Sequence, residues 1–138
     1  MTVRVPPYRH HVVPIVLISF TDQIDESLFT YLKSLSPAAL DLELRALTTL
    51  PALTVFANAL ARRLRSRRDF EAVQALVGVF TRMHGEVIVE NANADDEEGR
   101  ELEEAVESLL EAQKTESARL LELVASSVGA LGFVRDVL

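Results

Sequence analysis

The last third of the 138-residue sequence limits the fold most, because it carries a helical pattern without a proline almost to Leu138. Nine of the seventeen residues from Asp95 to Glu111 are Asp or Glu, and they open this pattern. A long amphipathic helix that ends a chain usually offers one face to its own fold and another to a partner. The sequence therefore predicts a role in assembly.

The composition favours helices throughout the chain. Hydrophobic residues make up 49%, mostly Leu, Val and Ala, while Trp is absent and aromatic residues reach only 6%. A chain of this length suits one domain with one core. We expect an all-α bundle of about five helices with a long C-terminal helix. An irregular arm at residues 1–22, rich in Pro and β-branched residues, should precede a helical interaction domain at residues 23–138.

Helix boundaries can be read from the chain. Apolar residues take helical spacing from Asp25 to about Leu35. Ser36 followed by Pro37 predicts the start of a second helix, and Pro51 begins a third by the same reasoning. The carboxylate of Asp69 suits the N-terminus of a fourth.

The polar, acidic stretch 91–99 is the best loop candidate in the second half. Beyond it a helical period of Leu and Val continues to the end, weakened at Gly129 and Gly132. Either one long helix or two fits this segment.

Charge and hydropathy restrict the partners. Residues 1–84 carry a net charge of +3 and residues 85–138 carry −10, so the chain is not built to coat nucleic acid. The longest apolar run, Val12 to Phe20, is about half the ~20 residues that span a bilayer, which predicts no membrane partner. Arg4 and Arg9 before that run resemble a signal peptide only faintly.

No residue set predicts catalysis, a cofactor or a metal. The chain has no Cys, which fits a reducing compartment such as cytosol or nucleus, and it has no glycine-rich phosphate loop. His84 has no second ligand at helical spacing. Glutamates do share a helix face, but without a nearby His they indicate a solvated surface. These are Glu101, Glu104, Glu107 and Glu111.

Five arginines in seven residues form the one serious ligand-binding candidate, which we call the arginine corner. They could contact RNA phosphates, although no aromatic residues alternate with them. The favoured alternative is pairing with the acidic stretch 95–111, in this chain or in a partner. The residues are Arg62, Arg63, Arg65, Arg67 and Arg68.

Three segments together resemble a known family: LKSLSPAALDLELRAL from Leu32, SRRDFEAVQALVGVFTRMHGEVI from Ser66, and the closing LGFVRDVL. They are similar to the C-terminal helical domain of a tandem WD-repeat subunit of the UTP-B subcomplex of the small-subunit processome, in the family of the human glaucoma-associated WD-repeat protein. The likeness covers residues 25–138. It implies a non-catalytic scaffold in the nucleolus, needed for pre-rRNA processing.

The resemblance also implies the partners, which are paralogous WD-repeat subunits joined through their C-terminal helical domains. A homodimer of the isolated chain is a further expectation, and contact with pre-rRNA through the arginine corner is the alternative. The long C-terminal helix should supply the interface. The interface candidates are Leu120, Leu121, Val124, Val128, Leu131, Phe133 and Val134.

The motif positions that carry the resemblance have structural roles to fill. We expect Ser36 and Pro37 to cap a helix, and Asp41 or Glu43 to pair with the arginine corner and so fix how two helices pack. The other motif positions are Arg45, Arg67, Arg68, Asp69, Phe70 and Glu71.

Overall fold

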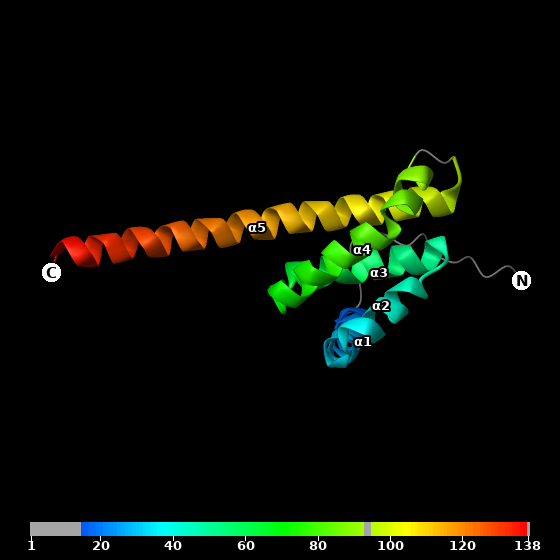
Figure 1. Ribbon diagram of the computed structural model, residues 1–138, viewed down its shortest axis with the longest axis horizontal. Helices are drawn as coiled ribbons and strands as arrows, with labels where there is room; N and C mark the ends of the chain where they lie inside the picture. The colour runs from blue at the N-terminus through cyan, green and yellow to red at the C-terminus, as the bar shows by residue number, and fades with distance from the viewer. Residues whose placement is uncertain (1–14, 93–94, 138) are drawn as a thin grey trace, which may run out of the picture. The chain divides into compact units, whose positions relative to one another are not determined.

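The computed structural model describes the backbone of residues 15–92 and 95–137, and the side chains from residue 23 onward (Figure 1). These residues form five helices and no strand, which confirms the all-α prediction. The chain divides into two units, residues 1–35 and 36–138, and each is described on its own. The expected domain of residues 23–138 stays a prediction.

The first unit contributes helix α1, Ile15–Ser34. It begins earlier than expected, so residues 15–22, assigned to the arm from the sequence, are helical. No Pro or Gly interrupts this stretch, and its β-branched residues lower helix propensity only slightly. The rest of the predicted arm, residues 1–14, lies outside the described residues.

The second unit begins with two capped helices. Helix α2, Pro37–Arg45, starts where the Ser36 side chain accepts a hydrogen bond from the Ala39 amide at 3.3 Å, as predicted. Helix α3, Leu50–Arg65, starts in the same way, with the Thr49 hydroxyl accepting from the Ala52 amide at 3.3 Å. Each cap satisfies an amide that the first helical turn leaves unpaired.

Helix α3 and helix α4, Phe70–Asn91, form much of the core. The rings of Phe56 and Phe80 meet with centroids 5.5 Å apart. The apolar side chains that recur at helical spacing are buried throughout α3, and in α4 they are buried except towards its ends. The fully buried side chains of these two helices include Leu53, Leu60, Leu64 and Val73.

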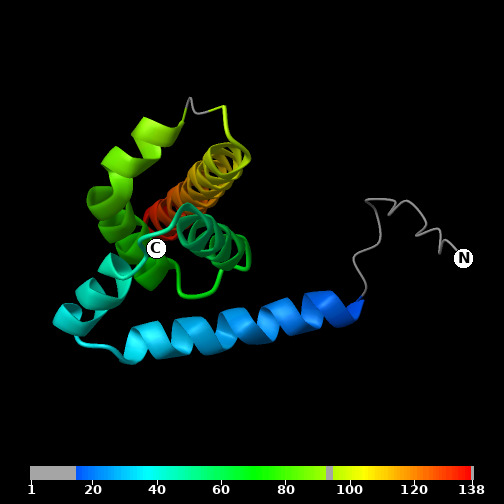
Figure 2. The same cartoon turned by 90° about the vertical axis from the view of Figure 1, so that its right-hand side faces the viewer.

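Helix α5, Glu97–Val137, is one continuous helix of 41 residues, which answers the question that the sequence left open. The Asp96 carboxylate accepts from the Gly99 amide at 3.1 Å and caps its N-terminus. Along its first half α5 packs chiefly against α3 and to a smaller extent against α4 (Figure 2). Its buried side chains there are Leu102, Ala105, Leu109, Ala112 and Glu116.

The second half of α5 extends past the other helices of its unit (Figure 1). From residue 118 to residue 137 every position is exposed except the half-buried Gly132. Nothing in the described part of this unit covers this half.

Candidate interaction surface

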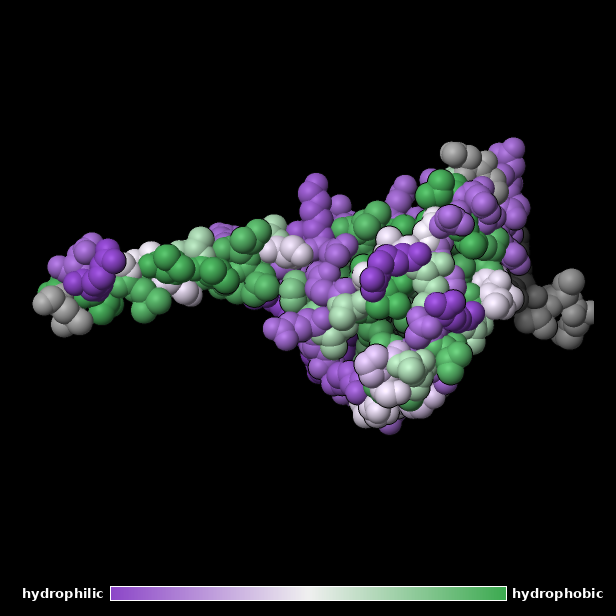
Figure 3. All heavy atoms as spheres, viewed as in Figure 1, coloured by the Kyte–Doolittle hydropathy of each residue, from purple (hydrophilic) through white to green (hydrophobic). Residues whose placement is uncertain are grey.

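The exposed half of α5 carries a dense set of apolar side chains. The seven predicted interface candidates are all exposed, from 46% at Leu120 to 70% at Leu121. Leu123 and Val137, which were not among the predicted candidates, are exposed as well. In Figure 3 apolar residues run along most of the extended part of the helix. The fold therefore leaves this leucine-rich surface uncovered.

Most of these side chains continue the face on which α5 already packs. The buried residues from Leu102 to Glu116 follow each other at intervals of three and four, and Leu120, Leu123 and Ser127 continue the series. Leu121, Val128 and Phe133 lie furthest around the helix from the middle of that face, and Phe133 lies on the opposite side from Leu121 and Val128.

Helix α5 is also long and apolar enough, by length and composition, to cross a membrane. Its most apolar 18-residue stretch has a mean hydropathy of 1.4 and is 0% buried. We expected no segment long and apolar enough to cross a membrane, on the basis of the run from Val12 to Phe20. Helix α5 corrects that expectation. Most of the Leu and Val residues of this half gather on one side, however, with Arg135 among them, while Glu122 and Asp136 lie on the other side of the helix. That one-sided pattern favours packing against protein, because lipid would surround the whole helix.

The arginine corner, at the turn between α3 and α4, is used inside the fold. Arg63 is 5% exposed and donates from Nε and an amino group to one oxygen of Asp69, at 3.1 and 2.5 Å. Arg62 and Arg68 are likewise engaged. A buried guanidinium held by a carboxylate fixes the turn and is not available to an outside ligand.

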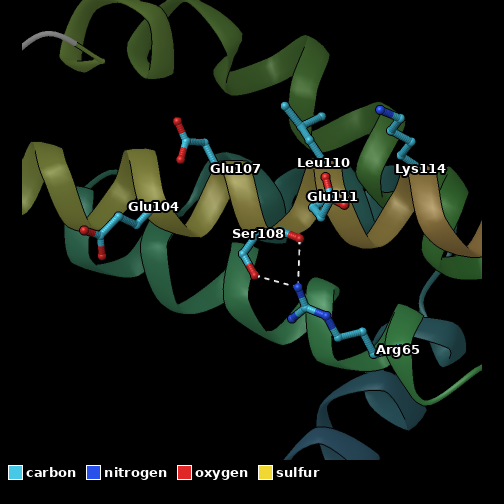
Figure 4. A pocket seen from close by; sticks show the side chains of 7 residues that line it. All are labelled: Arg65, Glu104, Glu107, Ser108, Leu110, Glu111 and Lys114. Carbon is cyan, nitrogen blue, oxygen red and sulfur yellow. Dashed lines mark hydrogen bonds between the residues drawn. The ribbon is translucent and has the colours of Figure 1, made fainter.

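Two further arginines hold α5. An amino group of Arg65 donates to the carbonyl and the hydroxyl of Ser108, at 3.1 and 2.9 Å (Figure 4). Arg67 lies 3.4 Å from the carboxylate of Glu116, which is nearly buried. Within this chain, Arg65 and Arg67 therefore do not make the pairing with the acidic residues of 95–111 that was predicted for the arginine corner. Their partners are a serine within that stretch and a glutamate beyond it.

The turn itself differs from the expectation for Asp69. Its backbone is left-handed, with φ 55° and ψ 39°, and its side chain makes no capping hydrogen bond to α4. Arg67 is left-handed too, with φ 60°. Because two non-glycine residues adopt this conformation within three positions, the turn is strained, and the Arg63–Asp69 pair helps to hold it.

Asp41 also has a partner other than the one predicted. Its carboxylate pairs with Arg45 one turn later in α2, at 2.7 Å, and not with the arginine corner. This pair is solvent-exposed on both sides. It therefore supports α2 locally and does not fix how two helices pack.

Two polar contacts between helices were not predicted from the sequence. The buried Nε2 of His84 lies 2.9 Å from the carbonyl oxygen of Leu44, which ties α4 to α2. Gln113 donates to the side-chain oxygen of Gln74 at 2.7 Å, which ties α5 to α4. Glu116 could have been found, because it extends the buried series of α5, but His84 carries no sequence signal of its contact.

The described residues contain no group of three or more His, Cys, Asp or Glu side chains that could hold a metal ion. Glu101, Glu104, Glu107 and Glu111 are exposed, as expected of a solvated face. The uncovered half of α5 is thus the most conspicuous feature of the described surface.

Comparison with known proteins identifies the family. The model of the Utp21 domain, described as WD40-associated and specific to Utp21, matches residues 19–135. The U3 small nucleolar RNA-associated protein 21 homolog of Schizosaccharomyces pombe is 40% identical over 114 residues, which are 80% of this chain and 12% of that protein. The U3 small nucleolar RNA-associated protein 21 of Saccharomyces cerevisiae is 31% identical over 126 residues, or 83% and 13%.

The chain spans only about an eighth of the length of these curated relatives. No solved structure matches it. The family match covers most of the chain and includes all the residues of α2, α3 and α4 and nearly all of α5. The chain therefore belongs to the family of the Utp21-specific, WD40-associated domain.

Proposed function

We propose that this chain is a non-catalytic protein-interaction module of the small-subunit processome. In this proposal it joins the subunit that contains it to paralogous WD-repeat subunits of UTP-B, through their C-terminal helical domains. The assembly acts in the nucleolus, in the processing of pre-rRNA. The names of the two relatives, both U3 small nucleolar RNA-associated proteins, support this setting.

One observation carries the proposal: the fold uses half of α5 and leaves the other half, with its apolar side chains, in solvent. A contiguous apolar surface of this extent on a soluble domain marks an interaction site. The side chains are Leu120, Leu121, Leu123, Val124, Val128, Leu131, Val134 and Val137.

The energy available is sufficient for a stable complex. Complete burial of a Leu or Val side chain contributes about 1.5 to 3 kcal/mol. Even half of that from each of these side chains amounts to roughly 6 to 12 kcal/mol, before the costs of association and ordering. The rigid helix lowers the ordering cost, because its backbone is already folded in the free chain.

The test replaces Val124 and Val128 with Asp in the full-length protein and measures co-purification of the paralogous UTP-B subunits. We expect co-purification to be lost, because each carboxylate would have to be buried without a partner. The matched control is Ser126→Asp, on the side of the helix away from both valines. Retention of the partners by a folded Val124→Asp, Val128→Asp variant would contradict the proposal.

The alternative, an RNA-contacting domain that uses the arginine corner, has less support. Arg63 is buried, and Arg65 and Arg67 bind Ser108 and Glu116. Charge reversal at the exposed Arg62 tests it in the full-length protein. Loss of pre-rRNA crosslinking at this position, with the assembly intact, would favour the alternative.

A further inference from the structure

We infer that the exposed half of α5 is enclosed from two sides, by a pair of neighbouring helices of one partner domain whose facing side chains are apolar. This inference rests on the proposed function and adds the form of the partner's binding site. A single partner helix would leave part of the apolar surface in water.

The width of the apolar surface is the first step. At about 100° per residue, Leu121 and Leu123 lie at opposite edges of an arc of roughly 160°, and of the eight exposed Leu and Val side chains only Val137 lies outside it, about 40° beyond Leu123. Leu120, Val124 and Leu131 lie between them, near its centre. Two-stranded pairing buries a narrow seam that repeats at two positions in seven. Here apolar side chains also occupy both flanks of that seam.

The area points the same way. A free energy of 1.5 to 3 kcal/mol at about 25 cal/mol per Å² corresponds to about 60 to 120 Å² for each buried side chain. The three central side chains would then bury about 180 to 360 Å², whereas a stable interface buries about 800 Å² on each partner. Adding the other five side chains brings the sum to about 500 to 1,000 Å². The central residues are Leu120, Val124 and Leu131, and the others are Leu121, Leu123, Val128, Val134 and Val137.

The first half of the same helix supplies a precedent within the chain. There α5 packs against both α3 and α4, and Figure 2, which looks along α5, shows the two helices on different sides of it. The Gln113–Gln74 bond and the Arg65–Ser108 bonds hold these two contacts. The first half of α5 is therefore already stable in contact with two helices at once.

The charges near the exposed stripe agree with an apolar partner. Arg119 lies 3.9 Å from Glu116, and Arg135 lies 3.7 Å from Asp136, so these side chains have partners within α5 itself.

The absence of Cys from the chain allows a direct test. Single substitutions Leu121→Cys and Leu123→Cys mark the two edges, Val124→Cys marks the centre, and Ala125→Cys is the control outside the arc. Each is introduced into the full-length protein, and its reaction rate with N-ethylmaleimide is measured by peptide mass spectrometry. Rates are compared between the isolated 138-residue chain and the full-length protein purified in its native assembly.

We expect both edges and the centre to react at least tenfold more slowly in the assembly, with the control less than threefold slower. Protection of the centre and one edge alone would overturn the two-helix inference and leave the proposed function intact. Protection at none of the sites would overturn the proposed function as well. If the isolated chain at high concentration is protected as strongly as the assembly and loses this protection on dilution, a second copy is the occupant and the inference is wrong.

Discussion

Arg67 and Glu116 lie 3.4 Å apart, and their ion pair joins the turn between α3 and α4 to the last buried position of α5. Beyond Glu116 the helix runs uncovered. The side chain of Glu116 is 10% exposed, so most of its hydration is lost on folding and Arg67 compensates for it. This contact therefore anchors the interaction surface to the bundle.

Removal of this anchor should weaken the bundle measurably. We expect Arg67→Ala to lower the free energy of unfolding by about 1 to 2 kcal/mol, because a nearly buried carboxylate loses a charged partner. Urea denaturation of the 138-residue chain measures the change. Arg45→Ala is the control, since its pair with Asp41 is exposed on both sides and should contribute less than about 0.5 kcal/mol. Equal effects of the two substitutions would show that burial of Glu116 carries no energetic weight.

The strained turn gives a second prediction. Arg63→Ala should destabilise the chain by about 3 kcal/mol, because Asp69 would lose a buried guanidinium that binds it twice. Arg63→Lys keeps the charge and loses the forked geometry, so we expect an intermediate loss. Thermal unfolding followed by circular dichroism would rank the three proteins. A lysine variant as stable as the parent would mean that charge alone holds the turn.

The sequence predicted the positions of the helices more completely than the side-chain contacts between them. The start of α2 follows from Ser36 and Pro37, and the core of α3 follows from helical periodicity, since both are local properties. The start of α1 could not be found, because β-branched residues fit a helix or a strand and only packing decides between them. The start of α4 at Asp69 was predicted correctly, but the partner of the Asp69 carboxylate was not. A carboxylate before a helix usually caps it, and only the fold brings Arg63 within its reach.

The candidate site shows the same division between local and long-range information. The exposed candidates on α5 could be found from the sequence because they repeat at helical spacing and exceed what a small core can bury. The partners of Arg65 and Arg67 could not, since Ser108 and Glu116 are more than forty residues away along the chain. Neither could the contact of His84 with Leu44, which depends on how α2 lies across α4.

That histidine contact leads to a third prediction. His84→Phe would keep an aromatic ring near Phe80, whose centroid lies 5.6 Å from that of His84, but it would remove the donor to the carbonyl of Leu44. We expect a loss of about 1 kcal/mol, the usual net contribution of one hydrogen bond. Denaturation of the chain with guanidinium chloride measures it. A phenylalanine variant that is more stable than the parent would show that the buried hydrogen bond contributes less than the apolar ring.

Gly78, in the middle of α4, should be replaceable with a gain in stability. No atom outside its own helix turn lies within 4 Å of a Cβ added there, and its backbone is helical. We expect Gly78→Ala to raise the free energy of unfolding by about 0.5 to 1 kcal/mol, because alanine loses less conformational entropy in a helix. The reverse change at the buried Ala57 of α3 is the control and should destabilise. A destabilised Gly78→Ala variant would indicate that the surface beside α4 is occupied in solution.

Salt distinguishes an apolar interface on α5 from an electrostatic one. Association through Leu and Val side chains should keep its affinity within about threefold between 0.1 and 1 M NaCl, because screening acts on exposed charges and not on apolar burial. Sulfate should strengthen it, since that ion is excluded from protein surfaces. Isothermal titration of the chain with a paralogous C-terminal domain measures both, and a negative heat capacity of binding should accompany them. If the affinity instead falls as a power of the salt concentration, the contact is made by the arginine corner or by the acidic residues of α5. The slope of log affinity against log salt concentration counts the ions that charged groups release on binding.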